Sequence, residues 1–315
     1  MIHVKNLSRR YGDFAAVDKV TFAINSGEIV GLLGHNGAGK TTIMKMITGF
    51  LEPSEGSIEI NNLSINQHAK EIQQYIGYLP ENLPVYPELN VLDYLFYCAQ
   101  VRNIPADKQQ DAVAAAVRKT ELAEKAMHPI STLSRGFKQR VGVAQALIHN
   151  PKILILDEPT NGLDPHQTQQ MRNLVRSLAT HATVIISTHI MQEVDALCDR
   201  VLILDNGQLA IDQTLASLRR SDTLALSSSI SGDKLNAILG EKYGALTAQQ
   251  ITADEYRIPL PETLDDRLFA SWLAEQLIQS GEKIYAINPL LRDLETVFRG
   301  IHQQKRHQGD KTHAA

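Results

Sequence analysis

The glycine-rich segment at residues 34–42 constrains the fold of this chain more than any other stretch. It has the sequence GHNGAGKTT and follows the apolar run IVGLL. Gly34 and Gly39 bracket four residues and precede Lys40 and Thr41, which completes the pattern of a phosphate-binding loop. In such a loop the backbone N–H groups surround phosphate oxygens, and the positive end of the next helix points at the same anion. We therefore expect strand, loop and helix in this order. An ordinary glycine-rich turn, the alternative, would leave the lysine and the threonine unexplained.

The polar side chains of this loop have predicted roles. The Lys40 ammonium is expected at the β- and γ-phosphates of a nucleotide, and the Thr41 hydroxyl is a candidate magnesium ligand. Tyr11 precedes the loop between two alternating segments, where its ring could stack on adenine or simply pack against the fold. The predicted nucleotide-binding residues of this region are Tyr11, Gly34, Asn36, Gly37, Ala38, Gly39, Lys40, Thr41 and Thr42.

Two acidic residues follow a second apolar run more than a hundred residues later. The segment KILILDEPTNGLDP at residues 152–165 has the near-continuous apolar character of a buried parallel strand. Asp157 at the strand end is a candidate magnesium ligand, and Glu158 a candidate base or orienting group for an attacking water. Simple solvation of a loop is the alternative. The phosphate-binding loop earlier in the chain favours the catalytic interpretation.

Two further strands end in residues that could reach the same site. YIGYLPEN places Glu81 after one strand, and ATVIISTH ends in His189. Ligands of open α/β sheets bind outside the carboxyl ends of the strands, so we predict that both side chains face the phosphates. The alternatives are a solvated loop glutamate and a structural histidine.

The middle of the chain is expected to be helical and to carry two surfaces of interest. Leu83 to Tyr97 is rich in apolar and aromatic residues, and Asn90 can cap the helix that follows it. An exposed apolar stretch of this kind often contacts a protein partner, although the helical stripe within it could be core. In LSRGF, Ser134 can cap another helix and Gly136 allows close approach, so this helix start is a second possible phosphate contact.

Composition narrows the function classes. The length of 315 residues suggests about two domains, and the net charge of -4 without a dense basic block argues against nucleic acid as a partner. The only cysteines, Cys98 and Cys198, lie far apart in the sequence and form neither a CxxC motif nor a framework of paired cysteines. This usage is typical of proteins in a reducing cytoplasm. No apolar run is long enough to span a membrane, so a transport function would require another chain to form the path.

Together these motifs resemble the ATP-binding subunits of ABC transporters over about residues 1–218. The loop resembles Walker A, LSRGF the family signature, ILILDE Walker B, and GLD the D-loop that contains Asp164, while His189 resembles the switch histidine. The signature departs from the usual pattern at Arg135 and Phe137, and Glu81 replaces the usual glutamine. No NKxD-type guanine motif supports a GTPase, and a single set of motifs without heptads disfavours a mechanical ATPase acting on ribosomes or DNA.

The resemblance implies several properties. It implies ATP and Mg2+ as ligands, with Glu158, His189 and Lys40 as catalytic residues and Thr41, Asp157 and Glu81 as metal ligands. It also implies a head-to-tail homodimer in which Ser134 and Gly136 of one chain face the ATP site of the other, with Asp164 of the D-loop among the nucleotide-binding residues. A separate integral membrane permease would dock near Leu83 to Tyr97, which places the chain peripherally on the cytoplasmic face of the inner membrane. The variant motifs resemble those of a bacterial exporter branch, including drug efflux and gliding-motility subunits.

The predicted fold class is an α/β phosphate-loop ATPase core with an antiparallel β flap and a helical subdomain at about 83–150. Residues 2–7 and 19–25 alternate as strands of the flap. Residues 219–303 are expected to form a small α+β, ferredoxin-like accessory domain with a dimer-stabilising or regulatory role, or a purely structural one. The polar tail at 304–315 is expected to be disordered.

Overall fold

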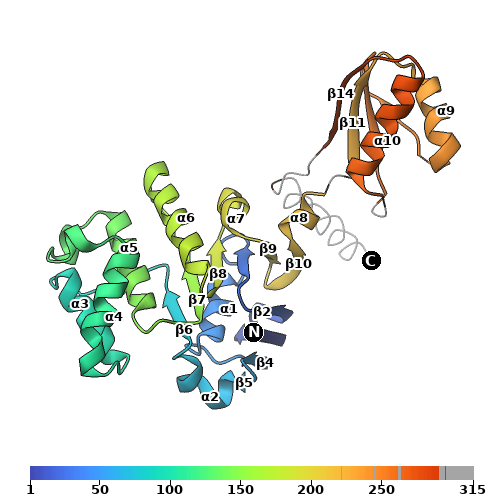
Figure 1. The fold of residues 1–315 in the computed structure, drawn as a ribbon. Coiled ribbons are helices and arrows are strands. Elements are labelled where there is room, and N and C mark those ends of the chain that lie inside the picture. Colours follow the sequence, from blue (N-terminus) through green and yellow to red (C-terminus); the bar gives the residue numbers. More distant parts are fainter. Residues whose placement is uncertain (221, 245, 262–263, 291–294, 296–315) are drawn as a thin grey trace. The chain divides into compact units, whose positions relative to one another are not determined.

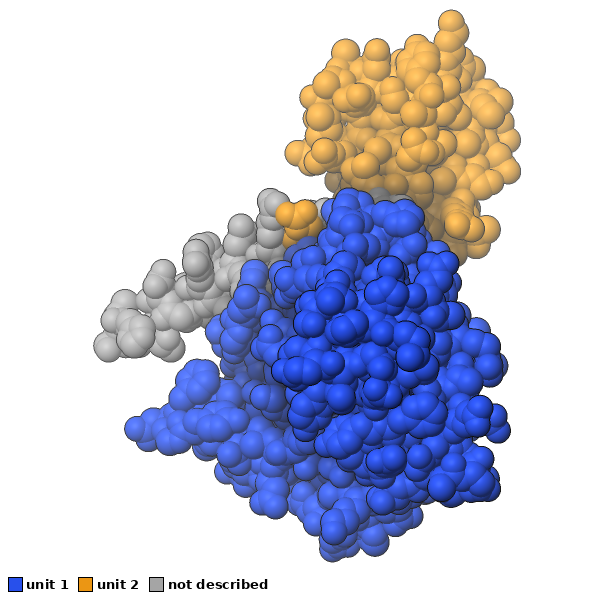
Figure 2. All heavy atoms as spheres, turned by 90° about the vertical axis from the view of Figure 1, so that its left-hand side faces the viewer, with its two compact units in different colours: residues 1–215 blue, residues 216–315 orange. Residues whose placement is uncertain are grey.

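The computed structural model describes residues 1–220, 222–244, 246–261, 264–290 and 295. The chain divides into two compact units, Met1–Leu215 and Ala216–Ala315 (Figure 2). Each unit has a hydrophobic core of its own.

A six-stranded sheet forms the centre of the first unit (Figure 1). Neighbouring strands are parallel except for the outermost pair, in which β10 runs antiparallel to β9. Every residue of the adjacent inner strands β7 and β8 is buried, which explains their continuous apolar sequences. In sheet order the strands are β10 (Gln208–Thr214), β9 (Arg200–Asp205), β3 (Ile29–Leu33), β8 (Thr183–Thr188), β7 (Ile153–Asp157) and β6 (Ile76–Leu79).

A four-stranded antiparallel sheet forms the predicted flap. Its order is β2 (Phe14–Ile24), β1 (Ile2–Tyr11), β4 (Glu55–Ile60) and β5 (Leu63–Ser64). One hydrophobic cluster joins its inward-facing residues to helix α1 (Lys40–Ile47) and to the central sheet. The phosphate-binding loop is therefore fixed between two packed sheets.

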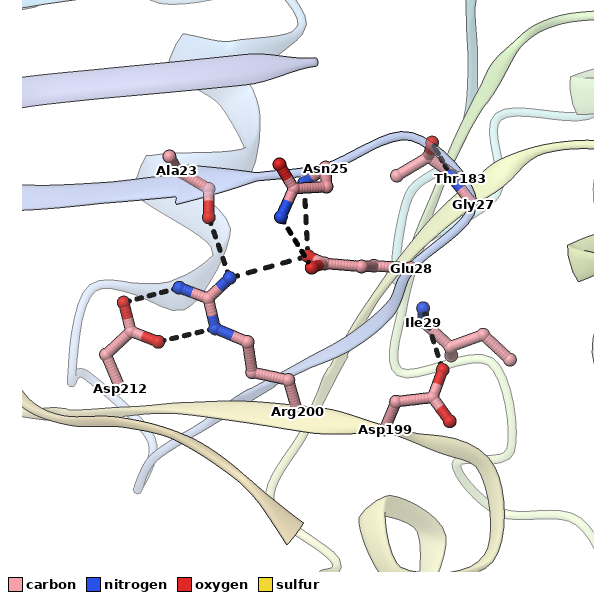
Figure 3. A network of polar contacts seen from close by, with 9 residues as sticks. All are labelled: Ala23, Asn25, Gly27, Glu28, Ile29, Thr183, Asp199, Arg200 and Asp212. Carbon is pink, nitrogen blue, oxygen red and sulfur yellow. Dashed lines mark hydrogen bonds and ion pairs between the residues drawn. The ribbon is translucent and has the colours of Figure 1, made fainter. Parts of the chain in front are cut away.

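An arginine network ties the edge of the central sheet to the flap (Figure 3). The Arg200 guanidinium on β9 donates to both carboxylate oxygens of Asp212 on β10, at 2.6 and 2.7 Å. It also donates to the carbonyl of Ala23 on β2 at 2.9 Å and lies 3.4 Å from Glu28. Burial acts to raise the pKa of Glu28, but hydrogen bonds from Asn25 and the charge of Arg200 hold it below its usual value.

The helical subdomain has a separate hydrophobic cluster. Its main helices are α3 (Val91–Val101), α4 (Ala106–Lys119) and α5 (Arg135–Leu147), with short 3-10 turns at Ala123–Lys125 and Ile130–Thr132. Asn90 caps α3 as predicted, because its side chain accepts a hydrogen bond from the Asp93 N–H at 2.8 Å. The first unit also contains α2 (Ile65–Ile72), α6 (Pro165–Ala179) and α7 (Met191–Leu197).

The second unit is a two-layer α/β fold. Its antiparallel sheet has the order β12-β13-β11-β14, and one hydrophobic cluster joins it to helices α9 and α10. The chain order β-α-β-β-α-β with this strand order confirms the predicted ferredoxin-like arrangement. The elements are β11 (Thr223–Ser228), α9 (Gly232–Tyr243), β12 (Gln249–Gln250), β13 (Glu255–Pro259), α10 (Asp266–Gln279) and β14 (Ile284–Pro289). The predicted helix at 290–303 and the predicted tail at 304–315 lie outside the described residues, apart from positions 290 and 295.

The flap strands β1 and β2 are longer than the predicted 2–7 and 19–25, because they pair as far as Tyr11 and Phe14 at the hairpin. Helix α1 begins at Lys40, directly after Gly39 ends the loop in a left-handed conformation with φ 102°. Helix α8 (Leu215–Leu218) is short, because β10 continues its pairing with β9 through Thr214. Helix α2 was not predicted at all; its sequence INQHAKEI is short and largely polar.

Candidate nucleotide-binding site

Parallel strand ends bring the predicted phosphate-site residues to one edge of the central sheet. The glycine-rich loop follows β3, Glu81 follows β6, Asp157 ends β7, and His189 follows β8. Because these strands are parallel and neighbouring, their carboxyl ends open on the same side. The sheet topology thus assembles residues from four distant parts of the chain.

The Lys40 side chain lies across the loop. Its ammonium donates to the carbonyls of Gly34 at 2.8 Å and of His35 at 3.2 Å, and the residue is only 6% exposed. Burial lowers the pKa of this ammonium, and the neighbouring carboxylates, that of Glu158 foremost, oppose the shift. The loop thus holds a largely desolvated cation, which is suited to contact a bound phosphate.

Thr41 and Asp157 form a second element of the site. The Thr41 hydroxyl lies 3.0 Å from Oδ2 of Asp157, whose side chain is almost completely buried. The other oxygen, Oδ1, is buried and has no hydrogen-bond partner among the described residues. A hydroxyl beside an unpartnered carboxylate oxygen fits Mg2+, a cation that is often held by one or two protein ligands with phosphate and water completing its shell.

Glu158 and His189 are paired. Nδ1 of His189 lies 2.9 and 3.0 Å from the two carboxylate oxygens of Glu158, which is 6% exposed. The backbone of Glu158 has φ 52°, a left-handed conformation that is uncommon for residues other than glycine. Its N–H donates to the Ser187 carbonyl of β8 at 3.0 Å. The strand therefore turns sharply at Glu158, directing its carboxylate toward His189.

Lys40, Thr41, Glu158 and His189 border an open cavity of about 470 Å³. Tyr11, half exposed, lies at its rim with the Arg9 guanidinium 4.9 Å from the ring centroid, and Glu81 also lines it. Three lining residues were missed by the sequence reasoning: Phe14, Ala16 and Asn161. Phe14 lies across the β1–β2 hairpin from Tyr11 and is 63% exposed, and no sequence motif marks it.

The remaining predicted residues lie elsewhere. Ser134 begins α5, where its hydroxyl accepts a hydrogen bond from the Phe137 N–H at 3.4 Å. Asp164 caps α6 by accepting from the Gln167 N–H at 2.8 Å. Ser134 and Gly136 line a separate cavity of about 320 Å³, which does not include Lys40. Within one chain the predicted residues thus form two groups.

Known proteins share the sequence of this site region. The profile of the ABC transporter family matches residues 17–161. An uncharacterised ABC transporter ATP-binding protein of Bacillus subtilis is 31% identical over 303 residues, which covers 95% of this chain and 94% of the relative. This chain belongs to the ABC transporter ATP-binding proteins. As a member of that family it is an ATPase, which confirms the resemblance and the activity predicted from the motifs.

Two further relatives of this chain are named for antibiotic transport or resistance. The bacitracin transport ATP-binding protein of Bacillus licheniformis is 34% identical, with coverage of 77% of this chain and 79% of the relative. The linearmycin resistance ATP-binding protein of Bacillus subtilis is also 34% identical, over 66% of this chain and 68% of the relative. None of the helices in the described ranges is long and apolar enough to cross a membrane.

Solved structures confirm the fold of the first unit. The ATP-binding subunit of an ABC transporter superimposes with a TM-score of 0.63 at 30% identity, covering 70% of this chain and 92% of that one. A dimeric bacterial ABC transporter cassette gives a TM-score of 0.63 at 26% identity, covering 68% of this chain and 99% of that one.

Proposed function

We propose that this ATPase forms a head-to-tail homodimer that powers a separate membrane permease, and that the transporter is an exporter. The observation that carries the proposal is the division of the predicted ATP-binding residues into two groups on one chain. Lys40, Glu158 and His189 border one cavity, whereas Ser134 and Gly136 border another. A second copy in the reversed orientation would bring the two groups together around each ATP.

The proposed chemistry assigns a role to each group at the first cavity. Lys40 stabilises negative charge on the phosphates, and Glu158 orients the attacking water or accepts its proton. His189 holds the Glu158 carboxylate through the 2.9 Å contact. Thr41 and Asp157 would hold Mg2+, with Glu81 as a further candidate ligand. Bound Mg2+ supplies positive charge that neutralises the phosphate oxygens.

The second cavity supplies the proposed contact with the partner's ATP. Ser134 and Gly136 belong to the first turn of α5, where unpaired N–H groups and the helix dipole favour an anion. Gly136 has little spare room: an added Cβ would lie 2.9 Å from the Gln167 side chain. Asp164 caps the neighbouring helix, and we propose that its loop forms part of the dimer interface.

The proposed permease-docking surface comprises exposed aromatic residues of the helical subdomain. Tyr86 and Tyr97 are 50% and 42% exposed, and their rings pack edge to face with centroids 5.4 Å apart. Both lie in the predicted docking segment Leu83 to Tyr97, and exposed apolar groups of this kind favour a protein contact. Such docking would place the chain on the cytoplasmic face of the inner membrane. Export as the direction is supported by relatives named for bacitracin transport and linearmycin resistance.

Dimer formation tests the proposal directly. Glu158→Gln should bind ATP without hydrolysing it, so sedimentation of this variant should show an ATP-dependent dimer. Adding Ser134→Arg should abolish the dimer, because a long cation would occupy the predicted phosphate contact. Ser231→Arg is a matched control, since Ser231 begins helix α9 of the second unit. A dimer that persists with Ser134→Arg would contradict the proposed composite site.

A further inference from the structure

A third cavity, larger than the two described above, lies at the opposite edge of the central sheet from the nucleotide site. It has a volume of about 860 Å³, within the range of small-molecule sites. Tyr75 and Lys152, which immediately precede strands β6 and β7, form part of its wall. The turn between α3 and α4 forms another part. None of the residues with a role in ATP binding or hydrolysis lines this cavity.

Its charged lining is entirely basic. Lys70, Arg102, Lys108 and Lys152 come from four different segments, and no aspartate or glutamate is among the described lining residues. The ion pairs among the described residues also leave all four of these cations without a carboxylate partner. In a protein of net charge -4, this concentration of unpaired positive charge is a local feature.

The negative ends of nearby helices offset only part of this positive charge. Helices α2, α3 and α5 all end near the cavity, and each carboxyl end carries roughly half a negative charge. The beginning of α4 contributes a similar positive charge. Three half charges cannot neutralise four full cations, so the cavity retains a positive potential that favours an anion.

Arg102 is the most enclosed of these cations. One N–H donates to the Gln73 carbonyl at 3.0 Å, and burial lowers the pKa of the guanidinium. A guanidinium has five N–H donors, so most of its donor capacity remains for a ligand. The adjacent His149 adds no charge at neutral pH, because burial and the charge of Arg102 lower its pKa to about 4.

Apolar groups share the cavity with these cations. Tyr75, Val101, Ile104 and Ile148 line it, and Val101 is 60% exposed. We propose that this cavity binds a small organic phosphate, with the phosphate among the four cations and an apolar body against Tyr75, Val101 and Ile104. A phosphate monoester carries nearly two negative charges and three acceptor oxygens, which match several converging cations better than one carboxylate does. The site is separate from the ATP cavity and does not depend on the proposed dimer.

Calorimetric titration with phenyl phosphate tests this proposal. The titration uses the full chain with the substitution Lys40→Ala, which removes the phosphate-binding cation of the nucleotide site. The parent chain saturated with a non-hydrolysable ATP analogue gives an independent measurement should Lys40→Ala fold poorly. Phenyl phosphate should bind saturably and more tightly than inorganic phosphate, whereas phenol should not bind.

Charge-neutralising variants then locate the site. Lys108→Gln combined with Lys152→Gln should weaken phenyl phosphate binding by about tenfold or more, because each removes a charge-assisted contact. Lys5→Gln combined with Lys119→Gln removes the same charge from exposed positions outside the cavity and should leave the affinity unchanged. No saturable binding, equal binding of inorganic phosphate, or equal losses in both double variants would overturn the proposal. The first outcome would point to the acidic segment of a partner protein as the occupant.

Discussion

The pairing of Arg200 with Asp212 should contribute measurably to the stability of the first unit. The two side chains are 20% and 28% exposed and make two short, parallel hydrogen bonds. Charge-assisted hydrogen bonds contribute roughly 1.5–3 kcal/mol each, and partial solvent exposure reduces that figure. We expect a coupling energy of about 1–2 kcal/mol in a double-mutant cycle of Arg200→Gln and Asp212→Asn. Arg200→Gln alone should cost about 2–4 kcal/mol, since it also loses contacts to Ala23 and Glu28.

The position of the only tryptophan makes this measurement selective. Trp272 belongs to the second unit, where it packs against Tyr243 with ring centroids 4.9 Å apart. Denaturant unfolding followed by circular dichroism should therefore shift in the Arg200 and Asp212 variants, while the Trp272 fluorescence transition stays in place. A coupling energy near zero would refute the view that this network ties the sheet edge to the flap. A shift of the Trp272 transition by the same amount would refute the assignment of the effect to the first unit.

Three other outcomes follow from the packing and the charges. Gly77→Ala should destabilise the first unit by about 1–3 kcal/mol in denaturant unfolding, because the added Cβ would clash with the Ala146 backbone of α5. Gly240→Ala in α9 is the control: its Cβ would contact no other group, so this variant should be neutral or stabilising. Tyr94→Phe should cost about 1 kcal/mol in the same assay, since the hydroxyl loses its 2.7 Å hydrogen bond to Gln145; an unchanged midpoint would contradict this. His149 has a pKa of about 4 in the folded protein against 6.5 normally, so the unfolded chain binds the extra proton and stability should fall by on the order of 2 kcal/mol as pH drops from 6.5 to 4. Unfolding at several pH values should show that His149→Gln removes this part of the pH dependence.

Much of the fold was predictable from local sequence. The runs IVGLL, KILILD and ATVIIST indicated buried parallel strands, and the structure places β3, β7 and β8 side by side. The carboxyl ends of neighbouring parallel strands lie at one edge of a sheet, so the sequence alone places their terminal residues together. The β-α-β-β-α-β order of the second unit followed from the alternation of its strands and helices.

Other features depend on contacts that local sequence does not encode. Helix α2 has a largely polar sequence and a kink at His68, and it is held by packing of its few apolar residues against the flap. Phe14 lines the nucleotide cavity because of the β1–β2 hairpin register, which no motif signals. The basic cavity likewise gathers residues from α2, α3, α4 and three connecting segments, whose proximity comes only from the tertiary fold.

Capture of a membrane partner would show whether this ATPase works on a permease. Tagged Glu158→Gln would be isolated in mild detergent with ATP, and retained proteins identified by mass spectrometry. We expect to recover a multi-spanning membrane protein, and we expect Tyr86→Arg combined with Tyr97→Arg to abolish its retention. Tyr285→Arg, at a residue of the second unit that is 59% exposed, should leave it unchanged. Retention of ribosomal or DNA-bound proteins without a membrane partner would contradict the transporter function and favour a mechanical ATPase.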